Sequence, residues 1–284
     1  MEIKEYKEMT TAKKKKFWRE HPLIGDIEIK LDGISSFKMK CDNDDSVVKE
    51  LHWTNFIGWE KTSLALWKNL LQHTGKQSVV LDIGAYSGIY SIIASKFENV
   101  KQIYAFDIQD NCIDRLHQNF KLNAIDKASI VKSACTDTDG QIEFYYYEEE
   151  GIMSSVAGIV KKKMNNLKAS VPSIKLDDWI RKDKNQNVKL VKIDVEGAEQ
   201  KTLEGMMGIL KTQKPDILIE INEAKHIRAI KNNIPKDYSI YDIIENELTI
   251  KKLGYFTKNS SDRNYLLTVK SKKDLTGIFQ GKVK

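Results

Sequence analysis

The stretch Val79–Gly88, VVLDIGAYSG, decides the fold of this 284-residue chain. An apolar run, typical of a buried parallel strand, ends at Asp82, and two glycines, Gly84 and Gly88, follow four residues apart. A strand that passes through glycines into a helix exposes backbone and a positive helix N-terminus at the carboxyl edge of the sheet, where open α/β sheets bind ligands. We therefore predict a small-molecule site at this turn.

The turn lacks the spacing of the usual phosphate-binding loops. Ala85 and Tyr86 follow Gly84 directly, so GxGxxG is absent, and no Lys-Ser/Thr pair follows as in a P-loop. Asp82 would repel a pyrophosphate but attract a cation such as a sulfonium. The next strand ends at Asp107, 25 residues after Asp82, about where nucleotide-binding folds place the acid that accepts the ribose hydroxyls. Together these features predict S-adenosylmethionine; the alternative is a plain strand–helix turn with Asp107 as a helix N-cap.

Around this stretch, short apolar strands alternate with amphipathic helices, which predicts a parallel sheet with helices on both faces. The expected strands are 78–84, 102–107, 128–135, 188–194 and 215–221. The expected helices are 60–73, 90–97, 112–123 and 198–210. The last part, 238–256 followed by 264–269, is expected to form a helix and then two strands joined by the polar turn 257–263.

Residues 1–58 are predicted to be an N-terminal extension or cap, and residues 59–284 the main domain. The extension begins with a charged helix. Its segment 26–42 alternates polar and apolar residues around Asp32-Gly33, which predicts a short hairpin.

Composition excludes several classes of protein. Lys+Arg 46 against Asp+Glu 40 gives a net charge of only +6, without the basic stripe of a nucleic-acid-binding protein, so no nucleic acid partner is expected. The three cysteines are widely spaced and form no CxxC pair, which indicates neither a disulfide framework nor a zinc site. The sequence has no secretory signal and no apolar run long enough to span a bilayer, so we expect a cytoplasmic protein. The oligomeric state stays open, a homodimer included.

The residues quoted so far belong to a longer series of motifs that resembles the FkbM-type methyltransferases, a branch of the class I S-adenosylmethionine-dependent enzymes. The motifs are GWEKT, VVLDIGAYSGIYS, YAFDIQDN, KSACTDTDGQIEF, GIMSSV, SIKLDDWI, VKIDVEGAEQKTLEGM, KPDILIEI and LGYF. The likeness covers roughly residues 55–268, and KIDVEGAE is its most specific part. It implies a Rossmann-like, doubly wound α/β fold with a mostly parallel seven-stranded sheet, an antiparallel last strand and a small N-terminal extension.

The resemblance also implies which residues bind the cofactor. On the methionine side these are Asp82, Gly84, Ala85, Tyr86 and Gly88; at the ribose, Asp107; and beside the adenine, Ser133 and Ala134. The chain departs from the family at two of these positions, because asparagine is common where Tyr86 stands and glutamate where Asp107 stands. Aspartate can still accept ribose hydroxyls, whereas Tyr86 changes access to the sulfonium.

Carboxylates at the other strand ends are candidates for the catalytic base. A sugar hydroxyl is too weakly acidic to attack unaided, and a positioned base contributes roughly a hundred- to ten-thousandfold in rate. Asp194 ends the strand 188–194, which is expected beside the glycine-bearing strand, and is the first candidate. Glu220, at the end of the next strand, is the second. Glu196 and Glu199 are candidates for either a site role or a structural role. The structural role of Glu196 would be to hold the shape of the turn, and that of Glu199 to stabilise a helix N-terminus.

Three further residues are weaker candidates for contacts with cofactor or substrate. Glu60 precedes the first core helix and matches a family position, which suggests a lid or methionine contact. Ser154 and Ser155 match a serine pair of the family; they either bond to cofactor or substrate or form a local serine turn.

No metal site is assigned. Asp194, Glu220 and Asn222 carry oxygen ligands that magnesium accepts, but no tighter cluster supports such a site.

We therefore expect an S-adenosylmethionine-dependent O-methyltransferase that acts on a hydroxyl of a sugar or glycan precursor. Two alternatives remain open. One is a methyltransferase for a natural-product or lipid hydroxyl, and the other is a non-catalytic protein that binds S-adenosylmethionine.

Overall fold

The glycine-bearing strand lies in the middle of the central sheet. The computed structural model describes residues 2–147, 153, 157–159, 161, 167–182, 187–222, 227, 230–231, 233–254 and 263–284. β3 (Ser78–Ile83) is buried along its whole length, because it pairs in parallel with β4 (Val100–Asp107) on one side and β9 (Val188–Ile193) on the other. Such two-sided burial explains why β3 is a continuous apolar run up to Asp82.

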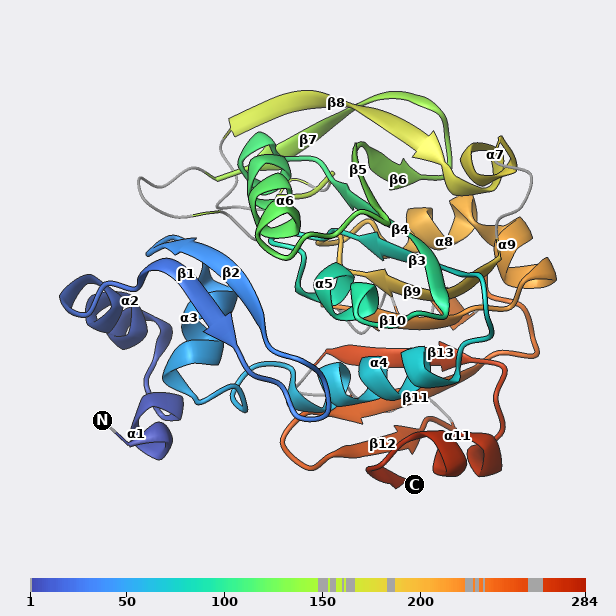
Figure 1. The fold of residues 1–284 in the computed structure, drawn as a ribbon. Helices are drawn as coiled ribbons and strands as arrows, with labels where there is room; N and C mark the ends of the chain where they lie inside the picture. Colours follow the sequence, from blue (N-terminus) through green and yellow to red (C-terminus); the bar gives the residue numbers. More distant parts are fainter. Residues whose placement is uncertain are drawn as a thin grey trace.

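The central sheet has nine strands in the described part of the chain, in the order β14-β12-β11-β13-β10-β9-β3-β4-β5 (Figure 1). The remaining strands are β5 (Ala128–Lys132), β10 (Asp216–Glu220), β11 (Ser239–Ile244), β12 (Thr249–Lys252), β13 (Asn264–Thr268) and β14 (Lys282–Val283). β5, β4, β3, β9 and β10 run parallel, and β13 is antiparallel to β10. The predicted fold class is confirmed. The expected seven strands are β5, β4, β3, β9, β10, β13 and β11, in their order in the sheet, and β12 and β14 extend that sheet beyond β11.

Helices cover both faces of the sheet (Figure 1). α4 (Lys61–His73), α5 (Ile89–Ser95) and α6 (Asp110–Leu122) lie on one face, and α7 (Leu176–Arg181), α8 (Glu199–Gly205) and α9 (Met207–Thr212) on the other. Val80 packs in one core with Trp67 of α4 and Leu116 of α6. Leu81, the next residue of β3, packs in the other core with Leu203 of α8. Successive side chains of a strand thus supply two separate cores.

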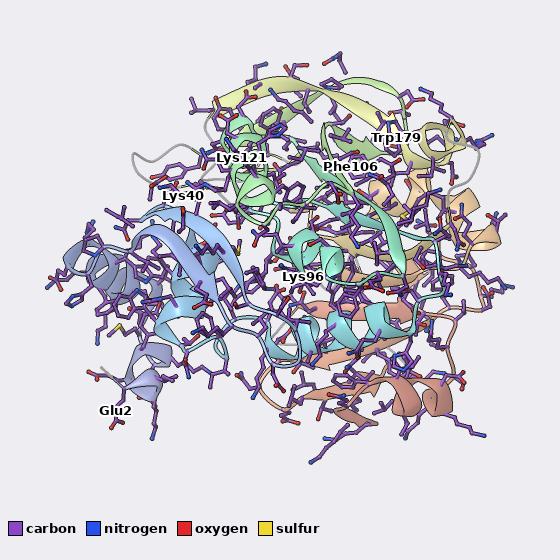
Figure 2. The ribbon with its side chains drawn as sticks, viewed as in Figure 1. Glu2, Lys40, Lys96, Phe106, Lys121 and Trp179 are labelled. Atoms are coloured by element: carbon purple, nitrogen blue, oxygen red, sulfur yellow. The ribbon has the colours of Figure 1, made fainter. Side chains whose placement is uncertain are left out.

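Aromatic rings fill the second core near the carboxyl end of β4. Phe106 meets Trp179 of α7 at a steep angle, with ring centroids 5.3 Å apart (Figure 2). Phe106 directly precedes Asp107 on β4, so this packing helps to fix the strand end that carries the acid.

The N-terminal region packs on α6 (Figure 1). It consists of α1 (Ile3–Lys7), α2 (Thr11–Glu20), β1 (Ile24–Ile29), β2 (Phe37–Asp42) and α3 (Ser46–Trp53). The predicted hairpin is confirmed, because β1 and β2 pair antiparallel. Arg115 of α6 donates to the Lys40 carbonyl oxygen and to Asp44 Oδ2, each at 2.7 Å, and this holds the N-terminal region against α6.

Two expected elements are interrupted. The strand expected over 128–135 breaks at Ser133, and β6 (Ala134–Thr136) joins a small sheet with β8 (Leu167–Lys175) and β7 (Gly140–Tyr146). The helix expected over 198–210 breaks at Met206 into α8 and α9. The reason is a tertiary contact with α7: the Asp177 carboxylate accepts hydrogen bonds from the backbone N–H groups of Gly208 and Ile209, at 2.7 and 2.9 Å, which starts a new helix.

The prediction of a helix within 238–256 was wrong, because this segment forms the antiparallel strands β11 and β12. Tyr241 and Ile243 pack in one core, whereas Ile240 packs in the other. This period of two is that of a strand, and the edge of β13 supplies the backbone partners. Of the polar turn 257–263, only Arg263 is among the described residues. None of the described helices has the length and apolar character needed to cross a membrane.

Candidate active site

A cavity of about 250 Å³ lies at the carboxyl ends of β3, β4, β9 and β10. This is the edge at which open α/β sheets bind ligands. Ser46 and Val47, at the start of α3, also line it. The N-terminal region therefore forms part of the cavity wall.

The two glycines of the turn meet different steric demands. Gly84 has φ +80°, and a Cβ there would stand 1.7 Å from the Asp194 carbonyl oxygen. Gly88 has φ +87°, is the N-cap of α5, and would place a Cβ 2.7 Å from Leu116. Gly84 lines the cavity and Gly88 is not among the residues that do so. The first glycine thus permits a close backbone approach at the site, and the second permits helix packing behind it.

Asp82 lines the cavity and also anchors α5. Its Oδ2 accepts hydrogen bonds from the backbone N–H of Ser91 at 2.9 Å and from the Ser91 hydroxyl at 2.7 Å. Burial raises the pKa of Asp82 to about 6. The carboxyl group is therefore mostly ionised at neutral pH, within reach of a cationic ligand.

Asp107 is surrounded by backbone donors. Its Oδ1 accepts from the N–H groups of Ile108 at 2.7 Å and Gln109 at 3.1 Å, and its Oδ2 accepts from Tyr86 N–H at 2.9 Å. Burial raises the pKa of Asp107 above its usual value. The N-cap of α6 is Gln109, so Asp107 does not hold the expected N-cap position. A carboxylate has about four acceptor positions, so about one remains for a ligand hydroxyl.

Tyr86 stands in the turn with φ +53°, a conformation that is rare for a large side chain. Its N–H is held by Asp107, and its hydroxyl donates to the Met153 carbonyl oxygen at 3.3 Å. Burial raises the pKa of Tyr86 well above its usual value, so the side chain is neutral. Asparagine tolerates this backbone region better than a large aromatic residue does.

The two residues expected beside an adenine also line the cavity. Ser133 and Ala134 follow β5, and the Ser133 hydroxyl donates to the Pro172 carbonyl oxygen at 2.8 Å. The hydroxyl is thus already bonded to β8 of the small sheet. The backbone at this position remains the cavity wall.

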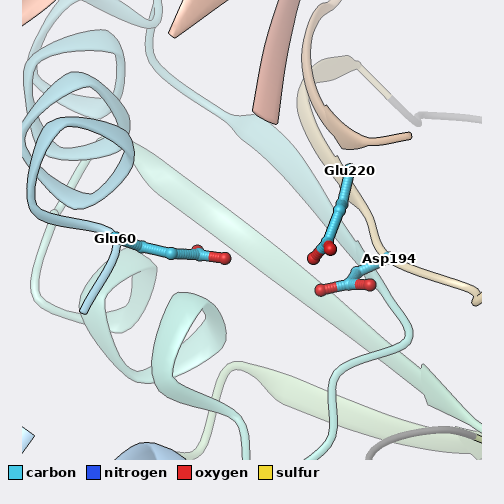
Figure 3. Close-up of side chains that lie close together, drawn as sticks. All are labelled: Glu60, Asp194 and Glu220. Carbon is cyan, nitrogen blue, oxygen red and sulfur yellow. The ribbon is translucent and has the colours of Figure 1, made fainter. Parts of the chain in front are cut away.

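Three carboxylates from distant parts of the chain meet at one end of the cavity (Figure 3). They belong to Glu60, Asp194 and Glu220, and one oxygen from each lies within 4.8 Å of the others. We call these three residues the carboxylate cluster. Glu60, the residue before α4, accepts from the Tyr90 hydroxyl and, at 3.3 Å, from the Asn264 amide. These bonds aim Glu60 across the cavity toward the two strand ends.

The two candidate bases differ in their surroundings. Glu220 is 14% exposed and lies 3.4 Å from Arg263 Nη2. Burial and then the neighbouring Asp194 carboxylate raise the pKa of Glu220, so it tends to keep a proton at neutral pH. Asp194 is 28% exposed and lies 3.6 Å from the Lys192 ammonium group. Asp194 therefore suits the role of base better.

Lys192 was missed in the sequence. It lies on β9 opposite Asp82, is 3% exposed, and has its Nζ 5.1 Å from the centroid of the Tyr90 ring. Its Nζ makes no hydrogen bond to any residue the structure describes. The signal was available, because a lysine interrupts the apolar run VKLVKI two residues before Asp194.

Glu196 and Glu199 lie in different places: Glu196 lines the cavity, whereas Glu199 is buried outside it. Glu196 lines the cavity with φ +53°, and its Oε2 accepts from the Asn222 amide at 3.2 Å. Glu199 is not among the lining residues; its Oε1 accepts from Gly197 N–H at 2.7 Å. Burial raises the pKa of Glu199 to about 7. These bonds support structural roles for both in the turn.

Two of the weaker predictions concern a serine pair, which stays a prediction, and a magnesium ligand. Ser154 and Ser155 lie outside the described residues. Asn222, weighed as a magnesium ligand beside Asp194 and Glu220, instead bonds to Glu196 and accepts from Arg263 Nη1 at 2.5 Å. Glu60 takes the third place near the two strand-end acids.

The cavity is strongly acidic. Among the described residues that line it, two are basic, Lys192 and Arg263. Six are acidic: Glu60, Asp82, Asp107, Asp194, Glu196 and Glu220. Such a cavity opposes a phosphate-rich ligand and favours one that carries positive charge. The carboxylates at the strand ends can also remove a proton from a bound group.

Comparison with known proteins adds independent findings. The family model described as the methyltransferase FkbM domain matches residues 82–256. The 2-O-methyltransferase NoeI of Sinorhizobium fredii is 24% identical over 139 residues, which are 45% of this chain and 56% of that protein. The chain thus spans about half the length of this curated relative.

Solved structures of methyltransferases are similar at low identity. The methyltransferase FkbM of Methylobacillus flagellatus is 15% identical, with a TM-score of 0.44 over 78% of this chain and 52% of that one. TYW2 of M. jannaschii, solved in complex with AdoMet, is also 15% identical, with a TM-score of 0.44 over 87% and 85% of the two chains.

Proposed function

The chain belongs to the FkbM methyltransferase family, and on this basis we propose that it transfers a methyl group from S-adenosylmethionine to a hydroxyl of a sugar or glycan precursor. The observation that carries the proposal is the acidic cavity at the glycine turn, with Asp194 on its wall. Methyl transfer to a weakly acidic hydroxyl is served by both features, a place for a cationic donor and a base beside it.

The residues of the cavity fit S-adenosylmethionine. When bound, this cofactor supplies a methyl group on a positively charged sulfur. Gly84 leaves open backbone at the turn, and the excess of acidic side chains offsets the positive charge. The methionine side would be held by Asp82, Gly84, Ala85 and Tyr86, the ribose by Asp107, and the adenine by the backbone at Ser133 and Ala134. A pyrophosphate cofactor would meet repulsion from the same acids.

Asp194 is proposed as the base. It would receive the proton that the acceptor hydroxyl loses as its oxygen takes the methyl group from the cofactor sulfur, which leaves as a neutral thioether. Its backbone N–H donates to the Ile83 carbonyl oxygen at 2.8 Å, so the base is attached to the strand that carries the turn. Such fixed alignment can supply about 7 to 11 kcal/mol of a barrier, and the base itself roughly two to four powers of ten in rate.

Glu220 takes the neighbouring position, with its raised pKa. A carboxyl group that keeps its proton donates a hydrogen bond, whereas the carboxylate of a base such as Asp194 accepts one. The pair is therefore suited to orient an acceptor that carries more than one hydroxyl.

The acceptor is proposed from chemistry and family. NoeI is by its name a 2-O-methyltransferase, which supports an oxygen acceptor. A sugar offers adjacent hydroxyls to the carboxylate cluster. A natural-product or lipid hydroxyl is the alternative acceptor, and a non-catalytic protein that binds S-adenosylmethionine is the alternative function.

The test is an acceptor screen with S-adenosylmethionine labelled in its methyl group. The full chain is incubated with nucleotide sugars, polysaccharide and glycolipid precursors, natural products and lipids, and labelled products are identified by mass spectrometry. We expect label on a sugar hydroxyl. Label on natural products or lipids alone would support the alternative acceptor, and cofactor binding without any transfer would support the non-catalytic alternative.

A further inference from the structure

The buried ammonium group of Lys192 is the feature that the proposed reaction leaves unexplained. Lys192 is 3% exposed, and its Nζ makes no hydrogen bond to any described residue. The nearest anion is Asp194 Oδ2, at 3.6 Å. An ammonium has three N–H donors and is costly to bury, so a lysine in such a place needs a compensating charge.

The charges around Lys192 come from every element packed against it. Burial lowers the pKa of the ammonium group, but the surrounding carboxylates together raise it above its usual value. In decreasing order these carboxylates are Glu60 before α4, Asp194 just after β9, Glu220 on β10 and Asp82 on β3. The Tyr90 ring of α5 closes the remaining side. Lys192 is therefore a fixed positive charge beneath the carboxylate cluster.

The carboxylate cluster, taken alone, has the donor set of a divalent cation site. Its three oxygens lie within 4.8 Å of one another, and hard cations such as magnesium and manganese prefer carboxylate oxygen. The ammonium group 3.6 Å from Asp194 already supplies positive charge there and would repel a second cation. Lys192 and a divalent cation thus compete for the same three carboxylates.

We propose that Lys192 is a positioning residue of the methyl transfer, acting as the resident cation of the carboxylate cluster in the place that a divalent metal ion would otherwise take. It holds the Asp194 carboxylate in place beside the glycine turn. The catalytic role of Lys192 rests on the proposed function. The charge compensation itself can be measured without any acceptor.

The test measures binding of Mn²⁺ alone, from the electron paramagnetic resonance signal of the free ion. Wild-type protein is compared with Lys192→Met, which removes the charge at similar size, and with Lys192→Arg, which keeps the charge. We expect Lys192→Met to bind one Mn²⁺ at least tenfold more tightly than wild type or Lys192→Arg. Adding Asp194→Asn to Lys192→Met should abolish that gain.

Two results would overturn the inference. One is tight Mn²⁺ binding by wild-type protein that disappears in Asp194→Asn, because the cluster would then be a metal site despite the lysine. The other is equal Mn²⁺ binding by Lys192→Met and wild type.

A folding control keeps the test decisive. If Lys192→Met does not fold, the double variant Lys192→Met with Asp194→Asn removes the positive charge together with the carboxylate nearest to it. Recovery of the melting temperature in the double variant supports charge compensation, and no recovery contradicts it.

Titration of the same proteins with S-adenosylmethionine separates the two proposals. If wild-type protein does not bind the cofactor, the proposed function fails whatever the Mn²⁺ result. If it binds the cofactor, the Mn²⁺ result decides on Lys192. With an acceptor identified, Lys192→Met should lower kcat at least tenfold while leaving the KM for S-adenosylmethionine within threefold, and Lys192→Arg should retain most of kcat.

Discussion

Gly84 lies directly against the backbone of Asp194: a Cβ on Gly84 would stand 1.7 Å from the Asp194 carbonyl oxygen. The contact joins the turn that is proposed to hold the cofactor to the residue that is proposed to act as base. One backbone approach between β3 and β9 therefore sets the distance between cofactor and base.

Gly84→Ala should destabilise the protein by about 2 kcal/mol or more, because the added Cβ meets backbone at positive φ. It should also weaken binding of S-adenosylmethionine. Gly75→Ala is the control, since Gly75 has open space around it. Urea denaturation and calorimetric titration measure the two effects, and equal behaviour of the two variants would contradict the proposed contact.

Asp194→Asn should leave affinity for S-adenosylmethionine nearly unchanged and lower turnover about a hundredfold or more, because an amide cannot take the proton. Initial rates with labelled donor check this. Asp178→Asn, at an exposed carboxylate of α7, should retain full activity. Wild-type turnover in Asp194→Asn would remove this residue as the base.

Arg115→Met should destabilise the protein by about 2 to 4 kcal/mol, because Asp44 and the Lys40 carbonyl lose a buried charged donor. Cofactor affinity should fall as well, since Ser46 of the same region lines the cavity. Arg115 is 6% exposed, whereas Arg181, the control, is 71% exposed. Arg181→Met should cost less than about 1 kcal/mol. Similar losses in both variants would mean that the N-terminal region is not held by Arg115.

Glu199 should make stability depend on pH. Burial raises its pKa in the folded protein from 4.5 to about 7, so the folded state holds the proton more tightly than the unfolded state. The resulting stability is present below the unfolded pKa and is lost as the pH rises through about 7. Relative to Glu199→Gln, the free energy of unfolding of wild type should fall by up to about 3 kcal/mol. Urea denaturation under acidic and alkaline conditions checks this, and a constant difference would refute it.

Much of the site could be predicted because it is local to strand ends. Asp82, Asp107 and Asp194 each end an apolar strand, and parallel strands that follow one another end at the same edge of a sheet. The glycine turn likewise depends on neighbours within the same short stretch. Predicting these features requires only the order of the helices and strands along the chain.

Other features depend on tertiary packing and could not be predicted. Glu60 reaches Asp194 because α4 packs across the sheet and because Tyr90 and Asn264 hold its carboxylate. The segment 238–256 was expected to contain a helix, because a short apolar run is ambiguous between helix and strand until a sheet edge is available. Lys192 could be recognised in the sequence as a charged residue within an apolar strand. The groups that surround it could not be predicted, because they come from α5, β3, β10 and the residue before α4.

The most direct test of the central claim is calorimetric titration of the full chain with S-adenosylmethionine and, in parallel, with NAD. The acidic cavity at the glycine turn predicts one-site binding of the cationic cofactor and no binding of the pyrophosphate cofactor. Binding of NAD without binding of S-adenosylmethionine would contradict the assignment of this site.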